Sequence, residues 1–411
     1  MGCNQSTSRP EIEKDKFQSE LGDVTIRCAY FSHRGHYPHV ENKPNQDSFV
    51  ITKNFTAIES DLFVGVFDGH GGTGHNCSQY VRDTLPDLLA QNIQRARDGG
   101  TNGKDLTEQQ LEEIIKKAHE ECNARMHTQE AFDDSASGTT SISAYLQGKL
   151  NKITVNNVGD SRAILGSLPI MQEEVKETAT LPLVASALSK DHTPWRKDER
   201  ERIEKCGGRI LSMGQLEEEQ SMRQLEEEHN KDTQKKKEED PVASGGRGSR
   251  ITFAFDATKK NKTPLKLAPW ELLDHDLILG EEIDESGDPP RVWCEKDGGQ
   301  FVLGAGFTRT MGDRTAEERV GLIAEPEVLV HELTPQDKVV FLASDGVFEF
   351  LTNQQVMDIC AECPDPLEAC EKIASKSRSL WMSKDAYVDD ITMICIYVDS
   401  VVGSSSSATE S

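Results

Sequence analysis

The stretch of sequence that decides the fold is Leu62-Phe63-Val64-Gly65-Val66-Phe67-Asp68-Gly69-His70-Gly71-Gly72. Its first six residues form a short apolar run, which is typical of a buried strand. The run stops at Asp68, and the glycines that follow allow the backbone to turn sharply. The segment therefore predicts a buried strand that ends in a carboxylate and continues into a glycine-rich loop.

Similar patterns predict further strands on both sides of this segment. Apolar and polar residues alternate over residues 24–30, which indicates a half-buried strand. Two helices are expected where Thr107 and Thr352 each open a T-x-x-Q capping box. Strands in runs, with helices between the runs, indicate an α+β architecture. The other strands are expected at residues 48–52, 141–146, 153–158, 163–165, 339–343 and 391–398.

Carboxylates recur where the predicted strands begin or end. They form five separate sites along the chain: Asp47, Asp68, Asp160, Asp345 and the pair Asp389-Asp390. A single Asp-Gly is often a plain turn, but a solvated carboxylate has no reason to recur at the edges of buried strands. If these edges converge, the mutual repulsion would be severe unless cations neutralise it.

The chemistry of this carboxylate set predicts which cations would bind. Oxygen ligands without clustered His or Cys favour Mg²⁺ or Mn²⁺ over zinc. The carbonyl of Gly69 could approach a bound ion closely, because Gly lets the backbone turn sharply. A pair of such ions can generate hydroxide from water and hold a phosphoryl group for in-line attack.

His70 lies two residues after Asp68 and is flanked by glycines. A histidine in so bare a loop is not expected to be a packed core residue. It could protonate a leaving alkoxide, because its ordinary pKa lies near neutral pH. The alternative is a solvated loop histidine without a catalytic role.

The same loop also matches a dinucleotide-binding fingerprint, G-x-G-x-x-G, at Gly69 to Gly74. A dehydrogenase is nevertheless disfavoured, because Asp68 would repel the pyrophosphate of the dinucleotide. The chain also lacks an acidic strand end about 20 residues later, and it lacks the regular alternation of strands and helices of a doubly wound fold.

Ten motifs, spread in order along residues 24–210 and 290–398, resemble the Ser/Thr protein phosphatases of the 2C type, also called the metal-dependent protein phosphatases. The motifs begin with Asn45-Gln46-Asp47-Ser48, Val66-Phe67-Asp68-Gly69-His70-Gly71-Gly72, Ser137-Gly138-Thr139-Thr140, Asn157-Val158-Gly159-Asp160-Ser161-Arg162-Ala163 and Leu188-Ser189-Lys190-Asp191-His192. They continue with residues 201–209, Phe307-Thr308-Arg309-Thr310-Met311-Gly312-Asp313, Ala324-Glu325-Pro326-Glu327, Ala343-Ser344-Asp345-Gly346-Val347 and Asp389-Asp390-Ile391-Thr392.

The resemblance implies a protein serine/threonine phosphatase whose two central antiparallel β-sheets form a sandwich flanked by helices, with the metals in a cleft at one end. His70 would act as the general acid. Asp160 would hold a third, weaker ion together with Asp345. The ligands of the two central ions would be Asp47, Asp68, the Gly69 carbonyl, Asp345 and Asp389.

The sequence departs from the family pattern in three places. Gln46 stands where the family often has Glu, and Glu349, near the metal site, stands where it often has Asp. The usual phosphate-binding arginine has no clear match, so Lys43 and Arg34 are the candidates for this role. The alternative function is a pseudophosphatase, a scaffold that binds phosphoproteins without turnover.

Composition limits the partners and outlines the domains. The net charge of -25 excludes a phosphate-tracking role on nucleic acid. Scattered cysteines, including the isolated pair Cys360 and Cys363, indicate free thiols in a reducing cytosol. We expect a monomer acting on phosphorylated proteins.

The chain is expected to divide into a flexible segment at 1–22, a phosphatase domain at 23–400 and a disordered tail at 401–411. An acidic low-complexity insertion at about 215–250 is expected to interrupt the domain, as an exposed helix followed by a linker.

The N-terminus carries a lipidation motif. Residues 1–6, Met-Gly-Cys-Asn-Gln-Ser, fit the M-G-x-x-x-[ST] pattern for myristoylation of Gly2. The adjacent Cys3 could take a palmitoyl group, and two acyl chains give stable attachment where one gives only marginal binding. The sequence therefore predicts a cytoplasmic protein held peripherally at a membrane.

Overall fold

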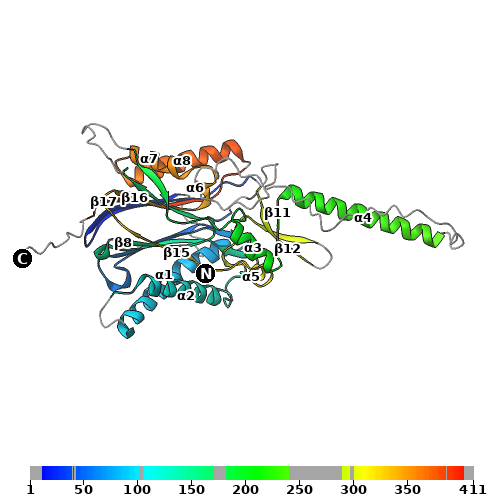
Figure 1. The fold of residues 1–411 in the computed structure, drawn as a ribbon. Coiled ribbons are helices and arrows are strands. Elements are labelled where there is room, and N and C mark those ends of the chain that lie inside the picture. The colour runs from blue at the N-terminus through cyan, green and yellow to red at the C-terminus, as the bar shows by residue number, and fades with distance from the viewer. Residues whose placement is uncertain are drawn as a thin grey trace, which may run out of the picture.

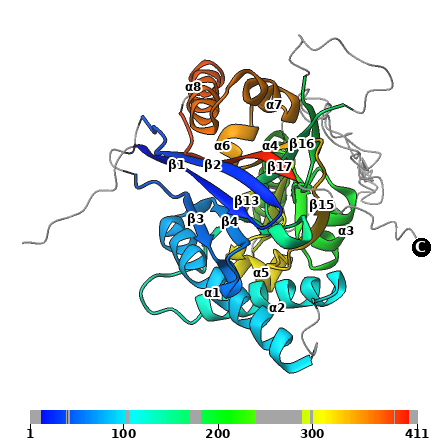
Figure 2. The ribbon, with the colours of Figure 1, turned by 90° about the vertical axis from the view of Figure 1, so that its left-hand side faces the viewer.

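Two antiparallel β-sheets packed face to face form the centre of the molecule, and helices cover the outer face of each sheet (Figures 1 and 2). The computed structural model describes residues 12–401 except 39, 41–42, 101–104, 170–181, 240–288, 297–299 and 386. This α+β sandwich confirms the predicted fold class.

The first sheet has six strands in the order β1-β2-β17-β16-β9-β10. All of its neighbouring strands pair antiparallel. The long strands β2 and β17 have mostly buried side chains, as expected of a sheet that is covered on both faces. The strand bounds are β1 Ile12–Leu21, β2 Val24–His33, β17 Ile391–Val401, β16 Asp337–Ala343, β9 Arg162–Ser167 and β10 Val184–Ala187.

The second sheet has five antiparallel strands in the order β15-β8-β7-β4-β3. The apolar run at 62–67 is the interior of β4, which is buried along its whole length. Val64 and Ile142 of this sheet pack against Val340 and Ile394 of the first sheet, in the core between the two sheets. The strand bounds are β15 Glu327–Glu332, β8 Lys152–Val158, β7 Ser141–Gln147, β4 Asp61–Phe67 and β3 Ser48–Lys53.

Helices on each outer face bury the other side chains of the sheets. α1 and α2 cover the five-stranded sheet around Phe63 and Tyr145, whereas α6, α7 and α8 cover the six-stranded sheet around Phe341. α2 and α7 begin at the predicted capping boxes, with Thr107 and Thr352 as N-caps. The helix bounds are α1 Gly74–Gly100, α2 Glu108–Met126, α6 Asp345–Phe348, α7 Asn353–Glu362 and α8 Pro366–Lys384.

Two small three-stranded sheets lie beside the sandwich. One, in the order β14-β6-β5, carries the glycine-rich loop, and the other, in the order β11-β12-β13, packs with α3 and α5. The remaining elements are β5 Gly69–Gly71, β6 Ser137–Thr139, β14 Met311–Gly312, β11 Arg209–Leu211, β12 Arg291–Glu295, β13 Phe301–Ala305, α3 Lys197–Lys205, α4 Met213–Glu239, α5 Arg314–Val320, and the 3₁₀ helices η1 Phe55–Ala57 and η2 Gly148–Leu150.

The structure contradicts the prediction of a flexible segment for residues 12–21. These residues form β1, which pairs with β2 along its full length. The polar side chains of β1 misled the prediction because they have structural partners: Lys14 and Lys16 form ion pairs with Glu371 and Asp365 at α8. Residues 1–11, including Gly2 and Cys3, lie outside the described residues.

The predicted insertion begins with α4, a mostly exposed helix that projects from the body of the molecule (Figure 1). Its first turns are anchored to the small sheet, because Glu219 pairs with Arg209 of β11 and Arg223 pairs with Glu295 of β12. Residues 240–250 and the tail from 402 onward lie outside the described residues. Among the residues that the structure does describe, no helix is long and apolar enough to cross a membrane.

Candidate active site

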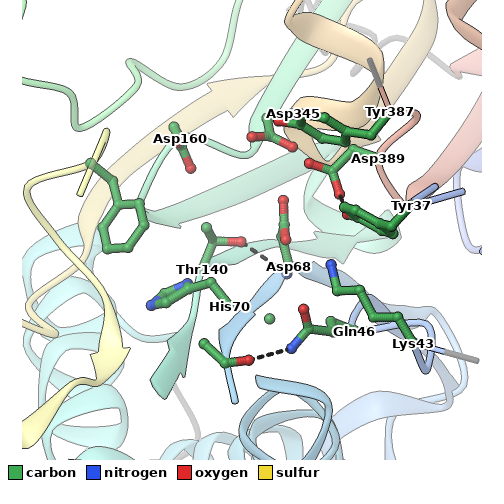
Figure 3. Close-up of a pocket in the computed structure, with 13 residues that line it drawn as sticks. Tyr37, Lys43, Gln46, Asp68, His70, Thr140, Asp160, Asp345, Tyr387 and Asp389 are labelled. Carbon is green, nitrogen blue, oxygen red and sulfur yellow. Dashed lines mark hydrogen bonds between the residues drawn. The ribbon is translucent and has the colours of Figure 1, made fainter. Parts of the chain in front are cut away.

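A cavity of about 290 Å³ opens at one end of the sandwich, and four of the predicted aspartates line it (Figure 3). Asp68 follows β4 and Asp160 follows β8, so both come from the five-stranded sheet. Asp345 follows β16 and Asp389 precedes β17, so both come from the six-stranded sheet. Carboxylates far apart in the sequence are therefore brought together where the two sheets meet.

Backbone contacts hold the turns that carry two of these carboxylates. The Asp68 N–H donates to the Thr140 hydroxyl at 3.0 Å, and the Thr140 N–H donates to the Asp68 carbonyl at 2.8 Å. Asp160 follows Gly159, whose φ of 99° lies in the left-handed region that favours glycine. The Gly159 N–H donates to His192 Nδ1 at 3.1 Å, which fixes the turn before Asp160.

Burial and neighbouring negative charge raise the pKa values of Asp68, Asp160 and Asp345. Burial, and then the charge of Asp345, holds the pKa of Asp68 well above its ordinary value. Burial, followed by the charge of Asp389, does the same for Asp345. Burial and the nearby charge of Asp191 raise the pKa of Asp160 to about 7. Such a cluster is unfavourable without compensating positive charge.

The donor set fits hard divalent cations. The cavity offers carboxylate oxygens together with Gly69, and among the described lining residues His70 is the one side chain with a nitrogen or sulfur ligand of the kind zinc prefers. Oxygen ligands suit Mg²⁺ and Mn²⁺. Asp68, Asp345 and Asp389, with Asp160 beside them, are the groups that would hold such ions.

A second acidic group lies elsewhere and is already compensated. The carboxylate oxygens of Asp198, Glu199 and Glu327 lie within 4.8 Å of one another. Arg309 donates to Glu199 at 2.7 Å, and Arg196 donates to Glu327 at 2.6 Å. Although burial opposes ionisation of Glu199 and Glu327, these arginines contribute to lowering the pKa of both carboxyls. The guanidinium groups therefore already neutralise these carboxylates, as a metal ion would otherwise do.

His70 lies on β5 at the edge of the cavity. Its Nε2 is 2.5 Å from Asp313 Oδ2, and its ring packs against Phe307 with a centroid separation of 4.4 Å. Asp313 is buried at the N-cap of α5, so its carboxylate orients the imidazole from a fixed position. The motif that ends in Asp313 was recognised in the sequence, but the contact between Asp313 and His70 was not predicted.

Asp47 does not line the cavity, and its role as a metal ligand stays a prediction. It is 1% exposed and lies behind the site, where its Oδ2 accepts a hydrogen bond from Ser344 Oγ at 2.9 Å. Burial and the charge of Asp390 raise the pKa of Asp47 to about 8. Its neighbour Gln46 lines the cavity instead and donates to the Gly71 carbonyl at 2.7 Å.

Of the three remaining candidate residues, one lines the cavity and two do not. Lys43 lines the cavity, with its Nζ 3.7 Å from the centroid of the Tyr37 ring. Arg34 and Glu349 are half-buried and do not line it. Burial, followed by the charge of Asp389, raises the pKa of Glu349. The lining residues that sequence reasoning missed are Tyr37, Thr140, Phe307 and Tyr387.

Comparisons with known proteins agree with this geometry. The family model described as "Protein phosphatase 2C" matches residues 36–232 and 295–382. The chain is 33% identical over 394 residues to "Probable protein phosphatase 2C 35" of Arabidopsis thaliana, a match that covers 94% of this chain and 90% of that protein. It is 25% identical over 357 residues to "Probable protein phosphatase 2C 64" of Oryza sativa subsp. japonica, with coverage of 86% and 62% respectively.

The fold has a similar solved structure. The crystal structure of the serine-threonine phosphatase 2C from Toxoplasma gondii superposes with a TM-score of 0.60 at 17% identity and covers 95% of this chain and 100% of that chain. The fold, the cluster of carboxylates and the sequence matches together define the class as a metal-binding protein serine/threonine phosphatase. The chain belongs to the protein phosphatase 2C family.

Proposed function

We propose that the chain hydrolyses phosphoserine and phosphothreonine in other proteins, with two Mg²⁺ or Mn²⁺ ions at the centre of the cavity and a third, weaker ion beside Asp160. The observation that carries the proposal is the convergence of Asp68, Asp160, Asp345 and Asp389 in one cavity. Burial and repulsion raise the pKa values of Asp68, Asp160 and Asp345 there. Ions held there would supply hydroxide at neutral pH and neutralise charge on the phosphoryl group.

Two side chains of the cavity act on the substrate in this proposal. His70 protonates the leaving serine or threonine oxygen, and Asp313 keeps its imidazole oriented for that transfer. Lys43 binds the phosphate, because it is the lining residue with a cationic ammonium group and belongs to no ion pair among the described residues. Gln46 is neutral and does not repel the phosphate.

A pseudophosphatase is the competing function, and metal-dependent turnover separates the two. Hydrolysis of a small aryl phosphate should rise with added Mn²⁺ and stop in EDTA. Asp345→Asn should lower the rate by orders of magnitude, whereas Asp87→Asn, on the exposed face of α1, should not change it. An absence of turnover at any Mn²⁺ concentration, with retained binding of a phosphopeptide, would favour the scaffold.

We also propose that the chain acts as a monomer attached peripherally to a membrane from the cytoplasm. The support is the sequence motif, in which Gly2 would carry a myristoyl group and Cys3 a palmitoyl group. Mass spectrometry of the N-terminal peptide from native cells tests the acyl groups directly. Light scattering of the purified chain tests the monomer.

A further inference from the structure

Backbone pairing places Tyr37 beside a carboxylate of the cavity. The His36 N–H donates to the Val388 carbonyl at 2.8 Å, and the Val388 N–H donates to the His36 carbonyl at 2.9 Å. This isolated antiparallel bridge sets the residue after His36 opposite the residue before Val388, which is Tyr387. The Tyr37 ring therefore stacks on Tyr387, and its hydroxyl reaches the carboxylate of Asp389, two residues further along the same segment.

The hydroxyl of Tyr37 fixes the orientation of the Asp389 carboxylate. It donates a hydrogen bond to Asp389 Oδ1, which also accepts the Asp390 N–H at 2.8 Å. Among the described residues, no hydrogen bond reaches Oδ2 of Asp389. One oxygen is thus held by two donors, and the other remains available to the cavity (Figure 3).

The ammonium group of Lys43 lies over the ring of Tyr37. The Lys43 Nζ lies 3.7 Å from the ring centroid, within the range of a cation–π contact. The Tyr387 ring stacks against Tyr37 with a centroid separation of 5.2 Å and an interplanar angle of 16°. Figure 3 shows Lys43 and Tyr387 on opposite sides of Tyr37, so the ring is fixed from one side and supports the ammonium on the other.

A lysine needs such support more than an arginine does. Its ammonium is a compact charge at the end of a flexible stem, whereas the guanidinium of arginine is a planar fork that binds phosphate through two parallel hydrogen bonds. Among the described residues, Lys43 forms no ion pair that would hold it in place. The aromatic face of Tyr37 is therefore the contact that keeps the ammonium at the cavity.

We propose that Tyr37 is a positioning residue that joins the metal site to the phosphate site: its hydroxyl orients Asp389 for a cation, and its ring seats Lys43 for the substrate phosphate. This rests on the proposed function of the cavity. The two parts of the side chain have separable effects, because phenylalanine keeps the ring and leucine removes both the ring and the hydroxyl.

Three variants of the full chain test this assignment. Tyr37→Phe and Tyr37→Leu are compared with Tyr30→Phe, which removes a phenolic hydroxyl from a ring that packs on Phe49 away from the cavity. Mn²⁺ affinity is measured by titration calorimetry without substrate. Inhibition by inorganic phosphate, and KM and kcat on an aryl phosphate, are measured at saturating Mn²⁺. Thermal unfolding in EDTA confirms that each variant is folded.

Tyr37→Phe should weaken Mn²⁺ binding by about tenfold or more, the usual effect of losing a group that orients a metal ligand. Its KM and its inhibition constant for phosphate at saturating Mn²⁺ should remain those of the wild type. Tyr37→Leu should weaken Mn²⁺ binding similarly and should also raise KM and the phosphate inhibition constant by about threefold to tenfold. Tyr30→Phe should match the wild type in all measurements.

The Lys43→Gln background tests whether the Tyr37 ring acts on phosphate binding through Lys43. If the ring acts through Lys43, adding Tyr37→Leu to Lys43→Gln should not raise the phosphate inhibition constant further. Unchanged Mn²⁺ affinity in Tyr37→Phe would overturn the role of the hydroxyl, and additive effects of Tyr37→Leu and Lys43→Gln on phosphate inhibition would overturn the role of the ring. Phosphate inhibition needs turnover, but calorimetry reads the binding of Mn²⁺ and of inorganic phosphate without it. A failure of the proposed hydrolysis is therefore distinguishable from a failure of this assignment.

Discussion

Replacing Asp160 with asparagine should stabilise the protein in the absence of metal. Asp160 lies partly buried among other carboxylates, and its pKa is raised from 3.8 to about 7 by burial and then by the charge of Asp191. A carboxyl whose pKa is higher in the folded than in the unfolded state destabilises the fold at high pH. The penalty is full above the folded pKa and disappears as the pH falls below the unfolded value.

The size of this effect follows from the two pKa values. A difference of about three pKa units corresponds to about 4 kcal/mol. The side chain is partly exposed, so solvent screening should reduce the penalty to about 2 kcal/mol at pH 8. At pH 5, closer to the unfolded pKa, the penalty should be under about 1 kcal/mol. Asp160→Asn should therefore gain more stability at pH 8 than at pH 5.

Urea unfolding in EDTA at the two pH values measures this gain, with Asp87→Asn on the exposed face of α1 as the matched control. Added Mn²⁺ should then stabilise the wild type more than Asp160→Asn, since the variant lacks one ligand. The reasoning is refuted if Asp160→Asn is no more stable than the wild type at pH 8, or if its gain is equal at pH 5 and pH 8.

Three further predictions follow from the site, the projecting helix and the N-terminus. His70→Ala should lower turnover of a phosphoserine peptide more than turnover of an aryl phosphate, whose leaving group hardly needs a proton; steady-state rates showing equal losses would contradict the assignment of the general acid. Glu219→Gln should weaken the ion pairs with Arg209 and Arg223 and increase hydrogen exchange in α4 without unfolding the core; unchanged exchange by mass spectrometry would show that other contacts anchor the helix. Gly2→Ala should release the protein to the soluble fraction of its native cells and Cys3→Ser should give a mixed distribution, and a wholly soluble wild type with an unmodified N-terminus would rule out acylation.

Local patterns in the sequence predicted the α+β architecture because the central strands are apolar and both capping boxes are complete, whereas the sandwich of two sheets was implied by the resemblance to the 2C-type phosphatases. The apolar run at 62–67 is the interior of β4, and the Thr107 box begins α2. Strand β1 escaped prediction because it lies at the edge of its sheet, where charged side chains are common. Its partners on α8 are more than 300 residues away, and polarity alone cannot reveal them.

Local patterns in the sequence also predicted part of the candidate site. The aspartates at strand ends were visible as a recurring pattern, and Asp68, Asp160, Asp345 and Asp389 line the cavity. Asp47, which the resemblance implied as a ligand, does not line the cavity, whereas its neighbour Gln46 does.

The contacts that orient the site could not be predicted from local patterns. His70 and Asp313 are 243 residues apart in the sequence, and Tyr37 and Asp389 are 352 residues apart. Each pair depends on the strand pairing of the whole fold, so composition and spacing near either residue carry no signal for its partner.

Release of inorganic phosphate from a phosphothreonine peptide tests whether the chain is a metal-dependent phosphatase. Purified wild-type protein is assayed with Mn²⁺ and with excess EDTA, and Asp68→Asn is assayed beside it under the same conditions. Metal-dependent hydrolysis predicts rapid release by the wild type with Mn²⁺, none in EDTA, and a rate lower by orders of magnitude in Asp68→Asn. Full activity in EDTA, or in Asp68→Asn, would rule out metal-dependent hydrolysis at this cavity.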